Sequence, residues 1–196
     1  MGEIKSAREI AMEKIEKLGE PSAEERLRWK YVPEGERLAA RYITIGCNLV
    51  DELSQYEENV KRYIIAGAED ILIRNINLPK NDLTKRSNRQ AMDGLKAIKN
   101  NKADVENVYS KIRRLFNHYI EPGEQQRRQA YESLKTELDA KIQQAIQQQL
   151  GPLARIKVDV EKQPQFQEEW RKVQAQLDSQ YLKLLDEYKQ ELLSID

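Results

Sequence analysis

The chain contains one histidine and one cysteine, and neither has the neighbours that a metal or nucleophile site requires. Di-iron bundle proteins carry a Glu-x-x-His pair on each of two helices, but the residue three positions before His118 is Leu115. Structural zinc takes four Cys or His ligands. Cys47 as a nucleophile would need His118 as its base from another helix, and we interpret it instead as a small, buried helix residue. The sequence therefore predicts no catalytic, cofactor-binding or metal site.

Two arginine pairs, Arg113-Arg114 and Arg127-Arg128, flank a turn at Pro122-Gly123. If this turn is the tip of a helical hairpin, the pairs approach each other and form a basic surface for RNA, an acidic protein or lipid headgroups. Each pair also fits an ordinary solvated helix face. The 33 basic residues equal the 33 acidic ones, which argues against general nucleic-acid binding. Nucleic acid or another anionic surface is therefore kept as the alternative partner.

Trp29 and Tyr31 place aromatic side chains beside Arg28 near the N-terminus. Because Trp, Tyr and Arg dominate the binding energy of many interfaces, Trp29 and Tyr31 are candidate anchors for a partner. The other interpretation is that these rings dock the N-terminal segment onto the rest of the protein.

Tyrosines at helical spacing suggest a third option, a small-ligand pocket in the core of a helical bundle. The tyrosines that would line such a pocket are Tyr42, Tyr56, Tyr63 and Tyr109. Tyrosines in these positions more commonly bury the ring and keep the hydroxyl wet, and the sequence has no glycine-rich phosphate-binding motif. A core ligand site is therefore the second alternative.

The elements that would position these residues begin with two short N-terminal helices. Apolar residues recur on one helical face over residues 4–18. Ser22 and Glu25 then form a capping-box pattern, which starts a second helix over residues 23–31 that ends before Pro33. We predict that residues 1–33 form an N-terminal arm and residues 34–196 a long-helix bundle.

Residues 36–77 contain no proline, and their apolar stripe runs from Leu38 to Ile71 with an 11-residue period. Such a period predicts a straight or slightly right-handed helix, roughly 60 Å long. Gly46 and Gly67 interrupt it and mark either close helix contacts or a bend. The next stripe, from Ala91 to Tyr119, follows a heptad as in a coiled coil and predicts one helix over residues 83–119.

The C-terminal part of the sequence predicts two more long helices, over residues 124–150 and 165–193. Between them, residues 151–163 form a linker. Its apolar residues alternate over 153–160 as in a strand, but a lone strand has no partner for its backbone, so we favour an extended linker or a helical turn.

Composition supports a helical protein: 34% of residues are charged, and there are only 8 glycines and 6 prolines. We predict an all-α fold, an elongated antiparallel bundle of about four long helices with the short two-helix arm. One cysteine, no signal-peptide pattern and no apolar run of about 18 residues predict a cytoplasmic protein without a membrane span.

The N-terminal run of Gly2, Glu3, Ile4, Lys5, Ser6 and Ala7, followed by residues 9–14, resembles the start of a small bacterial family of uncharacterised all-helical proteins. The resemblance covers about the first 20 residues and implies a bacterial, cytoplasmic protein of unassigned function.

Long amphipathic helices without a chemical site indicate a non-enzymatic scaffold or interaction protein. Apolar residues beside the stripes, including Ile43, Val50 and Leu182, widen the apolar faces beyond a two-helix seam. We therefore predict a protein partner, most simply a second copy of the chain in a homo-oligomer.

Overall fold

The structure, a computed structural model, describes residues 21–151 and 156–196. These residues form α-helices and one 3-10 turn, with no strand among them, so the predicted all-α class is confirmed. The helix predicted over residues 4–18 lies outside the described residues. The chain divides into two compact units, Met1–Arg74 and Asn75–Asp196, which are described separately below.

The first unit begins with α2 (Ala23–Ile45), whose start is as predicted. The Glu25 amide donates to Ser22 Oγ at 3.1 Å, and the Ser22 amide donates to Glu25 Oε2 at 2.7 Å. The predicted end before Pro33 is wrong, because α2 continues through this proline to Ile45. A proline inside a helix removes one hydrogen bond, but burial of Leu38 and Ala39 beyond it favours the longer helix. The predicted arm boundary at residue 33 falls inside α2.

The predicted single helix over residues 36–77 is also wrong. It is broken into α2, α3 (Leu49–Ser54) and α4 (Glu58–Arg74). Gly46 ends α2 with a left-handed φ of 82°, and its amide donates to Tyr42 O at 3.0 Å. The side chain of Asn48 then accepts from the Val50 and Asp51 amides and caps α3. The 11-residue stripe continued across this break because both sides face the same core.

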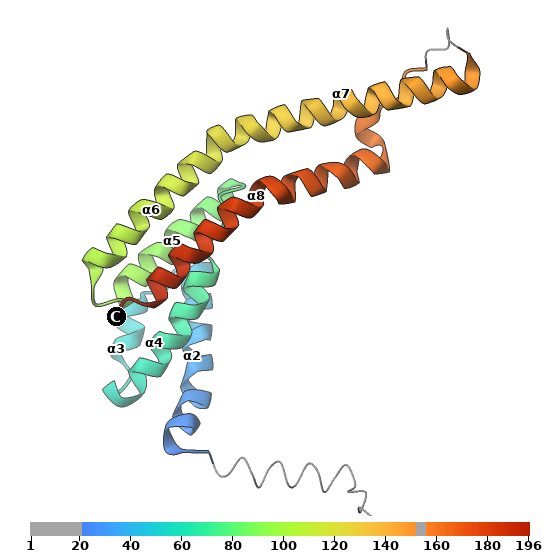
Figure 1. The fold of residues 1–196 in the computed structure, drawn as a ribbon. Coiled ribbons are helices and arrows are strands. Elements are labelled where there is room, and N and C mark those ends of the chain that lie inside the picture. The colour runs from blue at the N-terminus through green and yellow to red at the C-terminus, as the bar shows by residue number, and fades with distance from the viewer. Residues whose placement is uncertain (1–20, 152–155) are drawn as a thin grey trace, which may run out of the picture. The chain divides into compact units, whose positions relative to one another are not determined.

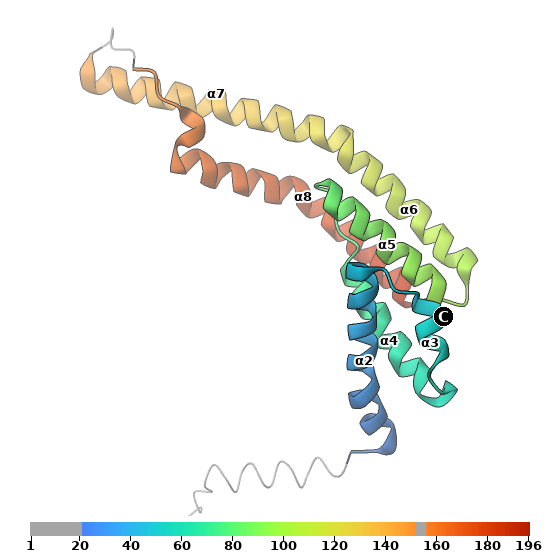
Figure 2. The same cartoon turned by 180° about the vertical axis from the view of Figure 1, so that it is seen from behind.

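Helices α2 and α4 lie side by side in both views (Figures 1 and 2). Gly35 and Gly67 lie in close contact with the facing helix: a Cβ added at Gly35 would lie 1.9 Å from Ile64 O, and one at Gly67 would lie 2.1 Å from Val32 O. Of the two roles considered for Gly67, the close helix contact is therefore the one observed, while Gly46 ends its helix.

The second unit contains α5 (Asp82–Ile98), α6 (Lys102–Ile120), α7 (Pro122–Leu150), a 3-10 turn (Val160–Lys162) and α8 (Pro164–Leu193). Helices α7 and α8 agree closely with the predicted ranges. The single helix predicted over residues 83–119 is wrong, because it is split into α5 and α6. The Asn101 side chain accepts from the Asp104 amide and starts α6. Residues 156–159 are irregular, and 153–155 lie outside the described residues.

Helices α5 and α6 form an antiparallel pair, in which Tyr109 Oη donates to Met92 O at 2.6 Å and Lys96 pairs with Glu106 at 2.8 Å. Helix α7 does not fold back on α6. Figure 1 shows that it continues the course of α6 after a bend, and Glu121 is the residue between the two helices. Helix α8 then returns antiparallel to both α6 and α7, and this arrangement positions the cavity described below. No described helix is long and apolar enough to cross a membrane.

Candidate functional site: a cavity at the α6–α7 bend

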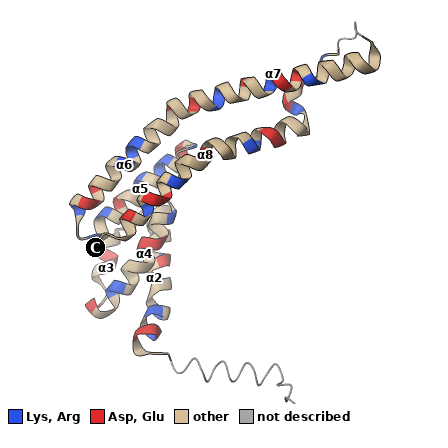
Figure 3. Ribbon diagram, viewed as in Figure 1, with Lys and Arg blue, Asp and Glu red and all other residues tan. Residues whose placement is uncertain are grey.

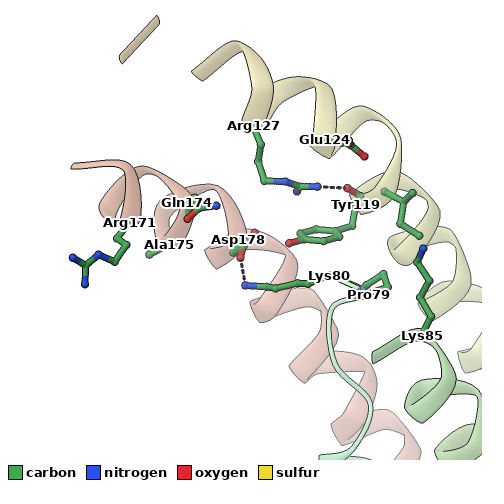
Figure 4. A pocket seen from close by; sticks show the side chains of 11 residues that line it. Pro79, Lys80, Lys85, Tyr119, Glu124, Arg127, Arg171, Gln174, Ala175 and Asp178 are labelled. Atoms are coloured by element: carbon green, nitrogen blue, oxygen red, sulfur yellow. Dashed lines mark hydrogen bonds and ion pairs between the residues drawn. The ribbon is translucent and has the colours of Figure 1, made fainter. Parts of the chain in front are cut away.

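A cavity of about 470 Å³ lies in the second unit where α6 bends into α7, opposite the middle of α8 (Figure 4). We call it the bend pocket. The segment before α5, together with α5, α6, α7 and α8, supplies its lining residues: Pro79, Lys80, Lys85, Tyr119, Ile120, Glu124, Arg127, Arg171, Gln174, Ala175 and Asp178. Its volume is in the usual range for small-molecule sites.

The bend brings α8 close to the start of α7. Pro122 occupies the first turn of α7, where its missing amide proton costs no helical hydrogen bond. Gly123 is buried, and a Cβ there would lie 3.0 Å from Tyr181 Oη and 3.3 Å from His118 O. His118 Nδ1 itself lies 2.9 Å from Tyr181 Oη. Gly123 therefore leaves the space in which Tyr181 of α8 contacts the bend.

Asp178 is the buried charge of the bend pocket, with 5% of its surface exposed. Lys80 Nζ lies 2.6 Å from Asp178 Oδ2 and ties the segment before α5 to α8. Asp178 Oδ1 has no hydrogen-bond partner among the described residues. A buried carboxylate oxygen without a donor is costly, so Oδ1 would gain from a hydrogen-bond donor.

Tyr119 stands between Asp178 and Arg127 at the centre of the view in Figure 4, with its hydroxyl directed toward Asp178. Burial and the negative charge of Asp178 raise the pKa of Tyr119 to about 12, although the Arg127 charge acts in the opposite direction. Tyr119 is therefore a neutral phenol near pH 7. Tyr181 packs edge-on against its ring at a centroid distance of 5.1 Å.

Arg127 is held in place by two contacts with Tyr119. Its guanidinium carbon lies 4.1 Å from the Tyr119 ring centroid, and Nη2 donates to Tyr119 O at 3.0 Å. A guanidinium has five donors, so most of those of Arg127 remain for a ligand. The whole lining has four cationic side chains, Lys80, Lys85, Arg127 and Arg171, against two carboxylates.

The structure separates the arginines that were predicted to form one basic surface. Arg127 lines the bend pocket, whereas Arg113 pairs with Glu106 at 2.7 Å and lines a different cavity between α5 and α6. Hydrogen bonds from Arg113 and Lys96 lower the pKa of Glu106 to about 2. Arg114 and Arg128 are exposed. Because α6 and α7 form a bend and not a hairpin, the two pairs do not meet at a tip.

The two aromatic residues predicted as partner anchors near the N-terminus lie among the described residues, but nothing in the structure tests that role. Trp29 is 65% exposed, and Tyr31 is half-buried, with Lys30 Nζ 4.7 Å from its ring centroid. Of the tyrosines proposed for a core pocket, Tyr63 lines a cavity of the first unit, and Tyr109 lines the α5–α6 cavity of the second. Their roles as anchors or ligand contacts stay predictions.

Sequence reasoning found Arg127 but missed Asp178, Lys80 and Tyr119 as members of one site. A signal for Asp178 was present, because it precedes the buried Leu185 and Leu192 of α8 by one and two heptads. A carboxylate in line with core leucines is unusual. In the described part of the chain, no group of three or more His, Cys, Asp or Glu residues could hold a metal ion.

A model of a family of unknown function (DUF6657) matches residues 50–194, which is more than half of the chain. The chain therefore belongs to this family. No curated protein and no solved structure matches it. Membership of an uncharacterised family is confirmed, while bacterial origin stays a prediction. The first 20 residues, which carried the predicted resemblance, lie outside both the family match and the described residues.

Proposed function

We propose that this member of a family of unknown function is a non-enzymatic helical interaction protein that self-associates. The interacting part would be the outer end of the second unit, defined as residues 131–150 of α7 with residues 160–170, and called the outer arm. The observation that carries the proposal is the thin packing of α7: of its 29 residues, only Gly123 and Leu138 are buried.

The core of the outer arm is a small cluster between two helices. Leu138, Val160 and Phe166 are its buried residues, and Tyr131, Leu134, Ile142 and Trp170 pack around them while partly exposed. Long helices gain most of their stability in proteins from packing an apolar face. A helix that extends about 30 Å beyond residue 130 with a single buried side chain therefore has surface available for a partner.

The end of α7 also lacks charge. Residues 142–150 contain no charged side chain, and Figure 3 shows this end of α7 without blue or red, unlike the rest of α7 and α8. Ile142, Ile146 and Leu150 follow one another at four-residue spacing and so share one side of the helix. Ile142 packs against the cluster, whereas Ile146 and Leu150 are not among its residues. Leu150 is 64% exposed. An uncharged apolar stripe flanked by glutamines suits contact with the same stripe of a second copy.

Light scattering coupled to size exclusion tests this proposal on the full chain over a wide concentration range. We expect a mass above that of the 23.0 kDa monomer. The double variant Ile146→Glu/Leu150→Glu should be monomeric, because two carboxylates would be buried without partners in the interface. A matched control, Leu83→Glu/Leu193→Glu, changes two exposed leucines of α5 and α8 outside the outer arm and should keep the wild-type mass.

Two results would contradict the proposal: a wild-type monomer at high concentration, or an outer-arm variant with the same mass as wild type. Circular dichroism of each variant checks that the helices are retained, so that loss of association is not confused with unfolding.

A further inference from the structure

We propose that the bend pocket binds a small phosphate monoester that also carries hydroxyl groups, such as a sugar or polyol phosphate. This inference does not depend on self-association, because the bend pocket and the outer arm share no residue. It rests on the combination of an excess of cationic side chains with one buried carboxylate oxygen that lacks a donor.

The cationic side chains define the charge of the ligand. Four of them face two carboxylates, and Lys80 is already paired with Asp178. Lys85 forms only an exposed pair with Asp82 at 3.0 Å, which holds it weakly. Figure 4 shows Arg127 between Lys85 and Arg171. The Arg171 side chain is directed away from Arg127, and its Nε donates to Gln167 O at 3.2 Å. The two excess positive charges match a phosphate monoester, which carries a charge of about −1.5 to −2 at pH 7.

Arg127 is the residue best placed to receive the phosphate. Its stacking on Tyr119 and its hydrogen bond to Tyr119 O fix the guanidinium plane, so little side-chain freedom is lost on binding. Arginine binds phosphate oxygens through two parallel N–H donors. An ordered arginine with free donors in a cavity is therefore suited to this anion.

Asp178 defines the other half of the ligand. Asp178 lines the same cavity, and its Oδ1 is buried and has no hydrogen-bond partner. A neutral hydroxyl donor suits this carboxylate, which would repel a second anionic oxygen. A hydroxyl group supplies one hydrogen bond to Oδ1, and the Gln174 amide beside it can bond a second hydroxyl. A ligand that is anionic at one end and hydroxylated at the other can bind the cationic side chains with one end and Asp178 and Gln174 with the other.

Isothermal titration calorimetry of the full chain tests the proposal with a defined set of probes. The probes are ribose 5-phosphate, glucose 6-phosphate, glycerol 3-phosphate, free glucose and inorganic phosphate. We expect at least one of the three phosphate esters to bind more than tenfold more tightly than inorganic phosphate and free glucose. Its affinity should fall as the salt concentration rises. Equal affinity for all probes, or no binding by any ester, would overturn the proposal.

Three variants separate the two halves of the site. Arg127→Gln removes the guanidinium that we assign to the phosphate and should weaken ester binding by roughly tenfold, whereas the control Arg114→Gln, outside the pocket, should leave it unchanged. Circular dichroism checks that both variants retain the helices. Asp178→Asn should weaken the esters but not inorganic phosphate, because the hydroxyl acceptor is changed while the cations remain. If Arg127→Gln and Arg114→Gln behave alike, or if Asp178→Asn affects esters and inorganic phosphate equally, the assignment is wrong.

Discussion

The ion pair between Lys80 and Asp178 joins a partly exposed lysine to a buried carboxylate. The Asp178 side chain is 7% exposed and that of Lys80 is 58% exposed, so Lys80→Met would leave a buried carboxylate with little access to water. We expect a loss of about 2 kcal/mol in the free energy of unfolding, below the cost of breaking a fully buried pair because the lysine is partly solvated. Urea denaturation followed by circular dichroism measures this change.

The exposed pair Lys141–Glu137, four residues apart in α7, provides the control. Lys141→Met should cost less than about 0.5 kcal/mol, as is usual for exposed ion pairs. Adding Asp178→Leu to Lys80→Met should recover part of the lost stability, since the uncompensated charge is then removed. Equal losses for Lys80→Met and Lys141→Met would show that the Lys80–Asp178 pair does not support the second unit.

For the packing of helices, the glycine contacts between α2 and α4 predict that Gly→Ala substitutions lower the stability of the protein, the opposite of their usual effect in a helix. In an open helix, Gly→Ala raises stability by up to about 1 kcal/mol. At Gly67 the added Cβ would lie 2.1 Å from Val32 O, a backbone atom that moves only with its helix. We expect Gly67→Ala and Gly35→Ala each to lower the free energy of unfolding by about 3 kcal/mol, measured by thermal or urea unfolding. A stabilising effect at either position would mean that α2 and α4 are not in contact there.

The observed helix boundaries also show how much of this fold can be predicted from the sequence. The starts of α7 and α8 were predictable within two residues, because Pro122 and Pro164 mark them directly. The breaks after Gly46 and around Asn101 were missed, since apolar stripes keep their spacing when two consecutive helices face one core. Periodicity reports which side of a segment is buried and does not report whether the helix axis is continuous. Cap residues carry that information, and Asn48 and Asn101 both act as caps.

The same reasoning explains the partial success at the candidate site. Arg127 was identifiable from charge beside a turn, because that property is local in sequence. Lys80, Tyr119 and Asp178 come from three separate elements, and their approach depends on the α6–α7 bend. The turn itself was predicted, but its geometry was not: Pro122-Gly123 is compatible with a hairpin and with a bend. Packing of Tyr181 against Gly123 is a tertiary contact that no local pattern specifies.

At the scale of the whole molecule, the family match and the compact units have different boundaries. The match covers residues 50–194, which include α4 and all of α3 except Leu49 but leave out α2. In the structure, α4 buries seven of its residues, and α2 packs on it through Gly35 and Gly67. A fragment comprising residues 50–196 would therefore expose part of the apolar face of α4, whereas a fragment comprising residues 75–196 would contain one compact unit.

Hydrogen exchange measured by mass spectrometry on both fragments and on the full chain tests this difference. We expect amides of α4 to be protected in the full chain and to exchange at least tenfold faster in the 50–196 fragment, because each large apolar side chain uncovered there costs about 1.5–3 kcal/mol of local stability. Amides of α5, α6 and the inner half of α8 should keep their protection in both fragments. If α4 stays fully protected without α2, the family range is itself a complete folding unit, and the division at residue 74 does not describe how the protein folds.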